Sequence, residues 1–104
     1  MANICSNEFL ISCEDPEICD LIEAKLEKFF TDKLDGEVTY NDDGIIEGYF
    51  DSRWSFPDDL FDDFFDEFDD DTIYMRCLSV EYGCCYIALN QYQHGEWSTQ
   101  SFDF

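Results

Sequence analysis

The residues whose types and spacing most suggest a function form an acidic segment, residues 58–71. Nine of its fourteen residues are acidic and none is basic. The other five fall at i, i+1, i+4, i+5 and i+8, which lie on one face of a helix; they are Leu60, Phe61, Phe64, Phe65 and Phe68. We therefore predict a helix over about residues 57–70 with one apolar face and one purely negative face.

The negative face is interpreted as a binding surface. Like charges four residues apart on a helix repel by a few tenths of a kcal/mol per pair, and Asp is a poorer helix former than Glu. Nine charges over ~21 Å of helix would approach the charge density of duplex DNA, one per ~1.7 Å. The pattern predicts a surface that imitates a nucleic acid backbone, with these partner-binding residues: Asp58, Asp59, Asp62, Asp63, Asp66, Glu67, Asp69, Asp70 and Asp71.

Further acidic residues lie in a predicted hairpin before this segment. They are Asp42, Asp43, Glu47 and Asp51. They would extend the binding surface if they faced the same way as the helix.

The sequence gives little support for a metal-binding, catalytic or phosphate-binding site. Residues 41–47 lack the alternating ligands and the bidentate Glu of a calcium loop. His94, the single histidine, lies beside Gly95 in a predicted turn without a local thiol partner. The six cysteines offer no zinc-ligand spacing, and neither a Gly-rich phosphate loop nor a serine nucleophile elbow is present. We expect a non-enzymatic protein with no catalytic residue, metal or cofactor.

The net charge defines the class of partner. Acidic residues number 26 against five basic ones, a formal charge of −21. Such a chain lacks the Lys and Arg needed to bind nucleic acid or an anionic membrane directly. The negative charge favours a basic partner, and proteins that bind nucleic acid are the commonest basic partners.

The expected location is the cytoplasm. The beginning of the sequence shows no charged region followed by an apolar one, as a secretory signal would. No apolar run approaches the ~20 residues that cross a bilayer. We therefore expect the cysteines to be reduced and mostly buried.

The predicted elements alternate between strands and helices in one domain, residues 1–104. Asp15 and Pro16 provide an N-cap and a first helical residue for the first helix, and the Asp43-Gly44 step indicates a hairpin. The phenylalanines of the acidic helix should pack against Ile22, Leu26 and Phe29. The predicted strands cover residues 4–13, 37–40, 45–54, 72–81, 84–92 and 96–102.

The order β-α-β-β-α-β predicts an α+β fold. Units of this kind form a ferredoxin-like sandwich, an antiparallel sheet with two helices on one face. One or two C-terminal strands are expected in addition.

Several short motifs resemble the YubB-like ferredoxin domains of phages and plasmids. They are Met1-Ala2-Asn3 with Cys5-Ser6-Asn7, the junction Phe50-Asp51-Ser52-Arg53-Trp54-Ser55-Phe56-Pro57, and the turn Glu81-Tyr82-Gly83. Ile4 stands where that family usually has Trp. The resemblance implies a mobile-element origin and a ferredoxin-like fold, and it implies no catalytic residues.

These observations lead to one main hypothesis and two alternatives. An acidic DNA mimic would block the nucleic-acid channel of a host defence complex, with a CRISPR–Cas effector as the first candidate target, which would make the protein an anti-CRISPR. Alternatively, the same surface would inhibit a restriction enzyme, a DNA glycosylase or a nucleoid protein. In the second alternative, the charge serves only solubility in a structural or interaction subunit.

Overall fold

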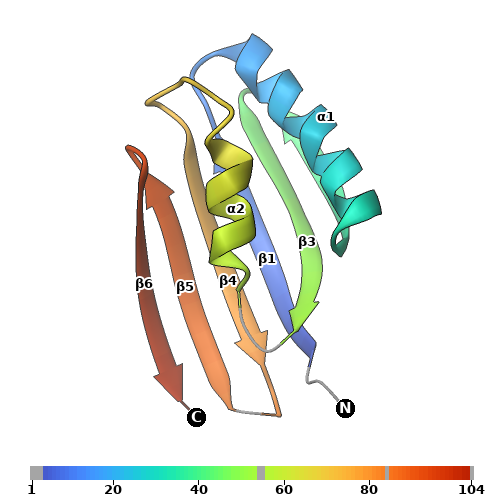
Figure 1. The fold of residues 1–104 in the computed structure, drawn as a ribbon, viewed down its shortest axis with the longest axis vertical. Coiled ribbons are helices and arrows are strands. Elements are labelled where there is room, and N and C mark those ends of the chain that lie inside the picture. The colour runs from blue at the N-terminus through green and yellow to red at the C-terminus, as the bar shows by residue number, and fades with distance from the viewer. Residues whose placement is uncertain (1–3, 54–55, 84, 104) are drawn as a thin grey trace.

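Six strands form one antiparallel sheet, and two helices cover one of its faces (Figure 1). The computed structural model describes residues 4–53, 56–83 and 85–103. The predicted strand end at Trp54 and strand start at Cys84 lie outside the described residues. The elements are β1 (Ile4–Ser12), α1 (Pro16–Asp32), β2 (Asp35–Asp42), β3 (Ile45–Arg53), α2 (Asp58–Phe65), β4 (Tyr74–Glu81), β5 (Tyr86–Gln93) and β6 (Glu96–Asp103).

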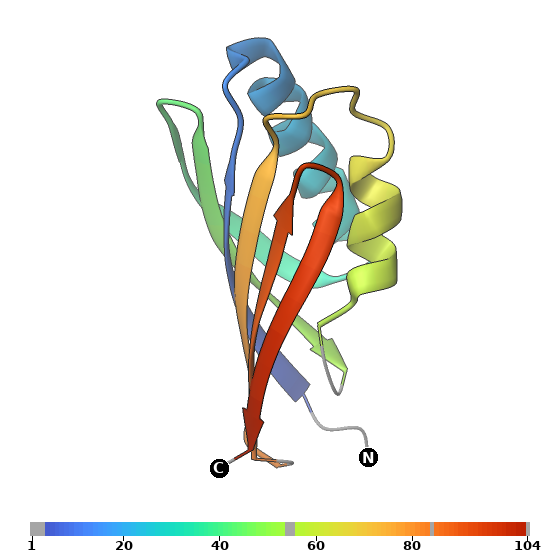
Figure 2. The ribbon, with the colours of Figure 1, turned by 90° about the vertical axis from the view of Figure 1, so that its left-hand side faces the viewer.

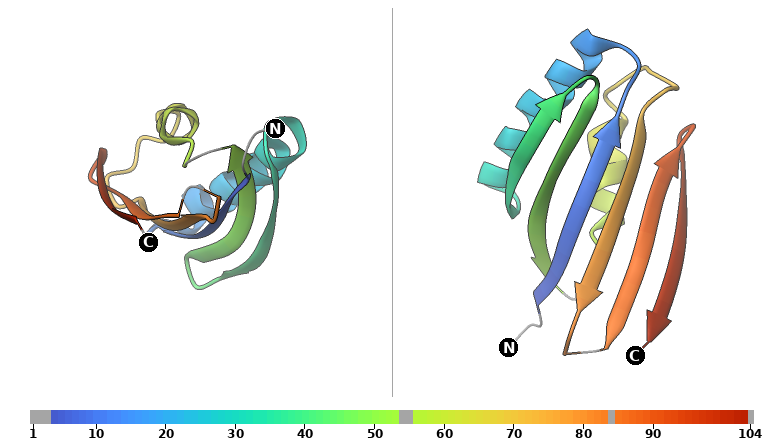
Figure 3. Two further views of the ribbon diagram at one scale, coloured as in Figure 1. Left: turned by 90° about the horizontal axis from the view of Figure 1, so that it is seen from below. Right: turned by 180° about the vertical axis from the view of Figure 1, so that it is seen from behind.

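The strand order is β2-β3-β1-β4-β5-β6, and every neighbouring pair is antiparallel. β3 lies between β1 and β2, so the β1-α1-β2 unit is split by an inserted strand. The prediction of an α+β fold with an antiparallel sheet is confirmed. Viewed from behind, the sheet shows a face that neither helix covers (Figure 3).

Local sequence signals account for the starts and turns of these elements. The Asp15 carboxylate accepts a hydrogen bond of 2.9 Å from the Glu17 N–H, which caps α1 ahead of Pro16. Asp43 and Gly44 have φ of 52° and 76°, and His94 and Gly95 have 52° and 77°. Two successive positive φ values are typical of the type I′ turns that match the twist of paired strands, so both hairpins form where they are predicted.

Helix α2 is shorter than predicted. It ends at Phe65, where the sequence pattern predicts a helix to about residue 70. The Phe68 N–H bonds to the Phe65 carbonyl, an i→i+3 turn that closes the helix. No basic residue stands in its last turn, so the carboxylates of Asp66 and Glu67 meet the negative end of the helix dipole. The two acidic rows therefore do not continue along a ~21 Å rod.

Phenylalanine rings fill the space between the helices and the sheet. The Phe61 ring lies 5.3 Å from that of Phe29 on α1 and 5.3 Å from that of Phe50 on β3. Phe64 also contacts Phe29, as predicted. Phe65 departs from the prediction, because its ring stacks 4.6 Å from that of Tyr92 on β5. Helix α2 is therefore held by α1 on one side and by the β5-β6 hairpin on the other.

Candidate acidic interface

Helix α2 divides a buried apolar side from an exposed acidic side. Phe61, Phe64 and Phe65 are at most 2% exposed. We define the α2 acidic face as five exposed residues, Asp58, Asp59, Asp62, Asp63 and Asp66. The first two lie in the first helical turn, where the positive end of the helix dipole stabilises carboxylates. Local electrostatics thus favour acidic residues at the start of α2 and oppose them beyond its end.

The side chain of Lys25 compensates one of the predicted binding residues. Its Nζ lies 2.7 Å from Oε2 of Glu67 and donates a hydrogen bond of 2.8 Å to the carbonyl of Phe64. The same ammonium group lies 4.5 Å from the centre of the Phe64 ring. Lys25 therefore caps the C-terminal end of α2 and forms an ion pair with the exposed carboxylate of Glu67.

Asp70 has a structural role in the loop after α2. Its carboxylate accepts hydrogen bonds from the Thr72 hydroxyl, at 2.6 Å, and from the Thr72 N–H, at 2.8 Å. The Cys13 thiol also donates to it, over 3.2 Å. These donors, the Thr72 hydroxyl first among them, lower the pKa of Asp70 below its ordinary value. Asp70 ties the loop to the end of β1.

Two further acidic residues are oriented by the C-terminal hairpin. Trp97 Nε1 donates a hydrogen bond of 3.2 Å to Asp62 Oδ1. His94 Nδ1 lies 3.3 Å from Asp71 Oδ2, so the lone histidine sits in a turn, as predicted, beside a carboxylate. Burial raises the pKa of Tyr92, and Asp62, Asp66 and Asp71 raise it further. The negative electrostatic potential of these three carboxylates therefore extends to the β5-β6 hairpin.

The remaining acidic residues of the segment carry uncompensated charge. Asp58, Asp59, Asp63, Asp66 and Asp69 are exposed. No lysine, arginine or histidine of the described residues forms an ion pair with them, since Lys25–Glu67 and His94–Asp71 are the two ion pairs found there. These five carboxylates are the ones most available to an external cation.

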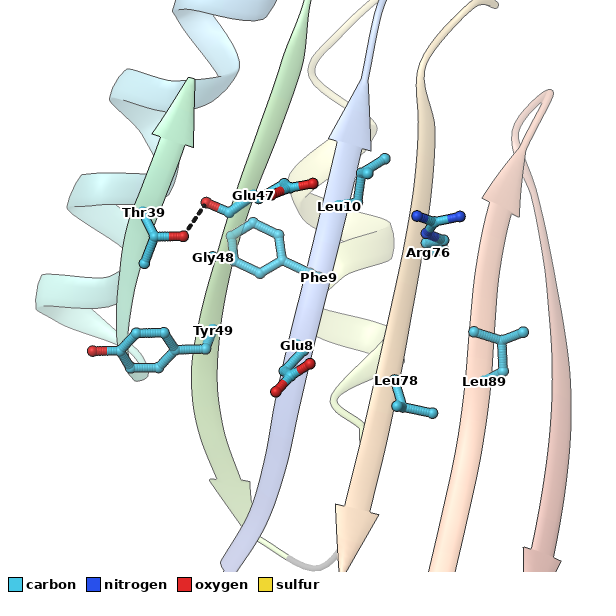
Figure 4. Close-up of a pocket in the computed structure, with 10 residues that line it drawn as sticks. All are labelled: Glu8, Phe9, Leu10, Thr39, Glu47, Gly48, Tyr49, Arg76, Leu78 and Leu89. Carbon is cyan, nitrogen blue, oxygen red and sulfur yellow. Dashed lines mark hydrogen bonds between the residues drawn. The ribbon is translucent and has the colours of Figure 1, made fainter. Parts of the chain in front are cut away.

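Of the four predicted extension residues, Asp51 lies beside the start of α2 and the other three lie elsewhere. Asp51 lines a cavity together with Asp58 and Asp59. Asp42 and Asp43 lie at the tip of the β2-β3 hairpin, on the side of the molecule away from α2 (Figure 2). Glu47 lies on the uncovered face of the sheet (Figure 4). Strand alternation explains this, because Ile46 and Phe50 of β3 face the core.

The uncovered face of the sheet carries a shallow groove of mixed character. Glu8, Tyr49, Arg76, Leu78 and Leu89 line it from four neighbouring strands (Figure 4). The Tyr49 hydroxyl donates a hydrogen bond of 2.8 Å to Glu37, which raises the pKa of the phenol. Apolar and charged side chains alternate over this groove, in contrast with the uniformly negative α2 acidic face.

Comparisons with known proteins return no significant match to a protein-family model, a curated protein or a solved structure. Among the described residues, no group of three or more His, Cys, Asp or Glu side chains is placed to hold a metal ion. None of the described helices has the length and apolar character needed to cross a membrane.

Proposed function

We propose that the protein is a non-enzymatic DNA mimic that blocks the nucleic-acid channel of a host defence complex, with a CRISPR–Cas effector as the first candidate. In this proposal it is a ferredoxin-like domain enlarged by the β5-β6 hairpin, related to the YubB-like domains of mobile elements. It would act in the cytoplasm of a bacterial host. Its partner would be a basic nucleic-acid-binding protein rather than nucleic acid itself.

The observation that carries the proposal is the α2 acidic face on its rigid support. Its five carboxylates are exposed, and none of them forms an ion pair with a described cation. The opposite side of the same helix is buried in aromatic rings. Charges held in place by a rigid support lose little conformational entropy on binding. A stiff DNA duplex has the same advantage.

Channels that hold a guide–target duplex contact its backbone and geometry rather than its base sequence. A protein can therefore compete for such a channel by presenting charge at a suitable spacing, without copying any base. Asp58 and Asp62 are separated by about 6 Å along the helix axis, one step of the acidic row. The mimic would engage lysines and arginines that otherwise contact phosphates.

The test measures DNA loading by purified targets. A guide-loaded, DNA-targeting CRISPR effector binds a fluorescent target duplex in an anisotropy assay, with a restriction enzyme and a DNA glycosylase assayed in parallel. We expect the protein to compete with the duplex at one of these targets. Competition should weaken steeply as salt rises from about 0.05 to 0.2 M, because exposed charge pairs are screened.

A matched pair of triple variants separates the specific face from net charge. Asp59→Asn, Asp63→Asn and Asp66→Asn together should weaken competition about tenfold or more. Asp20→Asn, Glu27→Gln and Asp32→Asn remove three charges from the exposed side of α1 and should have a much smaller effect. Equal losses would assign the effect to net charge. A target that loads its DNA while the protein stays bound would overturn mimicry.

A further inference from the structure

The two edges of the sheet differ in how they are protected. β2 forms one edge and β6 the other (Figure 3, right). The β2 edge carries an irregularity in its pairing between Val38 and Tyr40, and the acidic residues Asp35, Glu37 and Asp42. Bulges and charged side chains are the devices by which proteins prevent pairing at an exposed edge. The β2 edge is blocked in this way.

The β6 edge has no bulge, and its charged residues stand only at its two ends. All eight residues of β6 pair with β5 without a register shift, from Glu96 opposite Gln93 to Asp103 opposite Tyr86. The central residues, Ser98 to Ser101, are exposed, polar and uncharged, and the strand contains no lysine or proline. No described residue pairs with its outer side. A regular strand of this length presents a row of N–H and C=O groups to any extended chain.

The charge around this edge indicates what kind of chain fits it. Residues 86–103 contain no lysine or arginine. Glu96 and Asp103 mark the two ends of β6. On the helix side of the sheet, Asp62 is held against Trp97 of the same strand. A strand laid along β6 would therefore meet negative charge at both ends and on one face.

We propose that the outer edge of β6 receives an extended, basic segment of a partner protein as a seventh strand of the sheet. Side chains of the added strand would alternate between Trp97 and Asp62 on the helix side and Phe102 on the uncovered side. Phe102 is 65% exposed and lies opposite Ile87 of β5, so it has apolar surface left for a partner. Main-chain hydrogen bonds would supply affinity, and lysine or arginine at alternate positions would supply selectivity.

A second copy of the chain is disfavoured as the occupant. Twofold antiparallel pairing centred between Thr99 and Gln100 would place Glu96 of one copy against Asp103 of the other. Like charges directly opposite each other destabilise a strand pair. Each copy also carries a formal charge of −21, which opposes association. The proposed edge shares Asp62 with the α2 acidic face, but it would bind through the main chain of β6 and holds whether or not that face imitates DNA.

The test uses a labelled synthetic peptide of about nine residues with alternating lysine and valine. Its control is the same sequence N-methylated at the four central residues, which keeps the charge and removes hydrogen-bond donors from both peptide edges. We expect the unmodified peptide to bind about tenfold tighter than the methylated one at about 0.15 M salt. Equal affinities would mean that charge alone attracts the peptide, and would overturn the proposal.

Proline variants locate the site. Neighbouring N–H groups of a strand point in opposite directions, so one of Thr99→Pro and Gln100→Pro removes an outward donor and leaves the β5 pairing intact. That variant should keep the wild-type melting temperature and lose the preference for the unmodified peptide. The matched control is Thr39→Pro, at the residue of the other edge that the β2-β3 register skips and whose hydroxyl donates to the Glu47 carbonyl. This variant should retain the preference.

Hydrogen exchange on the wild-type protein tests the same contact without a substitution. Peptide binding should slow exchange at alternate amides of β6 and leave the amides of α2 unchanged. Protection over α2 instead of β6 would overturn the proposal. Sedimentation of the protein alone should give a monomer. A dimer that the outward proline variant dissociates would assign the edge to a second copy, against the proposal.

Discussion

Trp97 Nε1 donates a hydrogen bond of 3.2 Å to Asp62 Oδ1, across 35 residues of sequence. The Trp97 ring also packs against those of Phe56 and Phe65, with centroids 5.4 Å and 6.3 Å away. Trp97 of β6 therefore contacts α2 on its buried side, at Phe65, and on its exposed side, at Asp62. The C-terminal hairpin, which lies beyond the βαββαβ part of the chain, orients the acidic residues proposed to bind.

The first prediction concerns this contact. Trp97→Phe keeps an aromatic ring and removes the N–H donor, so the free energy of unfolding should fall by ~1 kcal/mol. Competition with DNA should weaken only a few-fold, because Asp62 keeps its charge and loses its fixed orientation. Urea unfolding and the anisotropy assay measure the two effects. Phe102→Leu, on the uncovered side of the same strand, is the control and should change stability by less than ~0.5 kcal/mol. Equal effects of the two variants would contradict a special role for Trp97.

The second prediction tests the anchoring of α2. Phe64 is 2% exposed, and its ring contacts both the ring of Phe29 and the ammonium group of Lys25. Phe64→Ala should lower the free energy of unfolding by ~3–5 kcal/mol, because it leaves a cavity. Leu60→Ala, at a position 37% exposed on the same helix, should cost much less. Urea unfolding compares the two, and a Phe64→Ala protein as stable as wild type would show that α2 is not docked in solution.

Local patterns explain how much of the fold can be predicted from the sequence. The Asp15-Pro16 start of α1 and the Asp43-Gly44 and His94-Gly95 turns depend on neighbouring residues alone. The end of α2 does not. Phe68 and Asp70 continue the helical spacing of the sequence. Contacts with residues distant in sequence nevertheless hold the segment after Phe65 in a loop instead of a helix. Asp70 is bound to Thr72 and Cys13, which lies 57 residues earlier.

The same distinction applies to the candidate site. The exposure of Asp59 and Asp63 follows from helical periodicity, and the sequence predicts it. The pairing of Glu67 with Lys25 and of Asp62 with Trp97 arises from tertiary packing, which no local pattern encodes. Glu47 is a different case, because the alternation of buried Ile46 and Phe50 around it already indicates the uncovered face.

The third prediction concerns the pH dependence of stability. Hydrogen bonds from Thr72 lower the pKa of Asp70 in the folded state from the ordinary 3.8. The unfolded chain then binds this proton more readily, so the stabilisation is complete above pH 3.8 and is lost as the pH falls through the lower folded value. Asp70→Asn should flatten the acid limb of the stability curve measured by urea unfolding. Asp69→Asn, which removes the same charge from the same loop, should leave that limb steeper. Parallel curves for the two variants would contradict the role of Asp70.

The last prediction separates stability from binding at Lys25. The Lys25 side chain is 25% exposed, and its ammonium group bonds to the Phe64 carbonyl and to Glu67. Lys25→Met retains an apolar stem over the Phe64 and Phe68 rings and removes both polar contacts, which should lower the free energy of unfolding by ~1–3 kcal/mol. The change also frees the Glu67 carboxylate beside the α2 acidic face. The variant should therefore compete with DNA as well as wild type or better, although it is less stable, which is the opposite pattern from the Asp59, Asp63 and Asp66 variant. Urea unfolding and the anisotropy assay at low temperature give the two quantities, and a loss of competition in a folded Lys25→Met protein would show that binding needs the arrangement held by Lys25 more than the charge it releases.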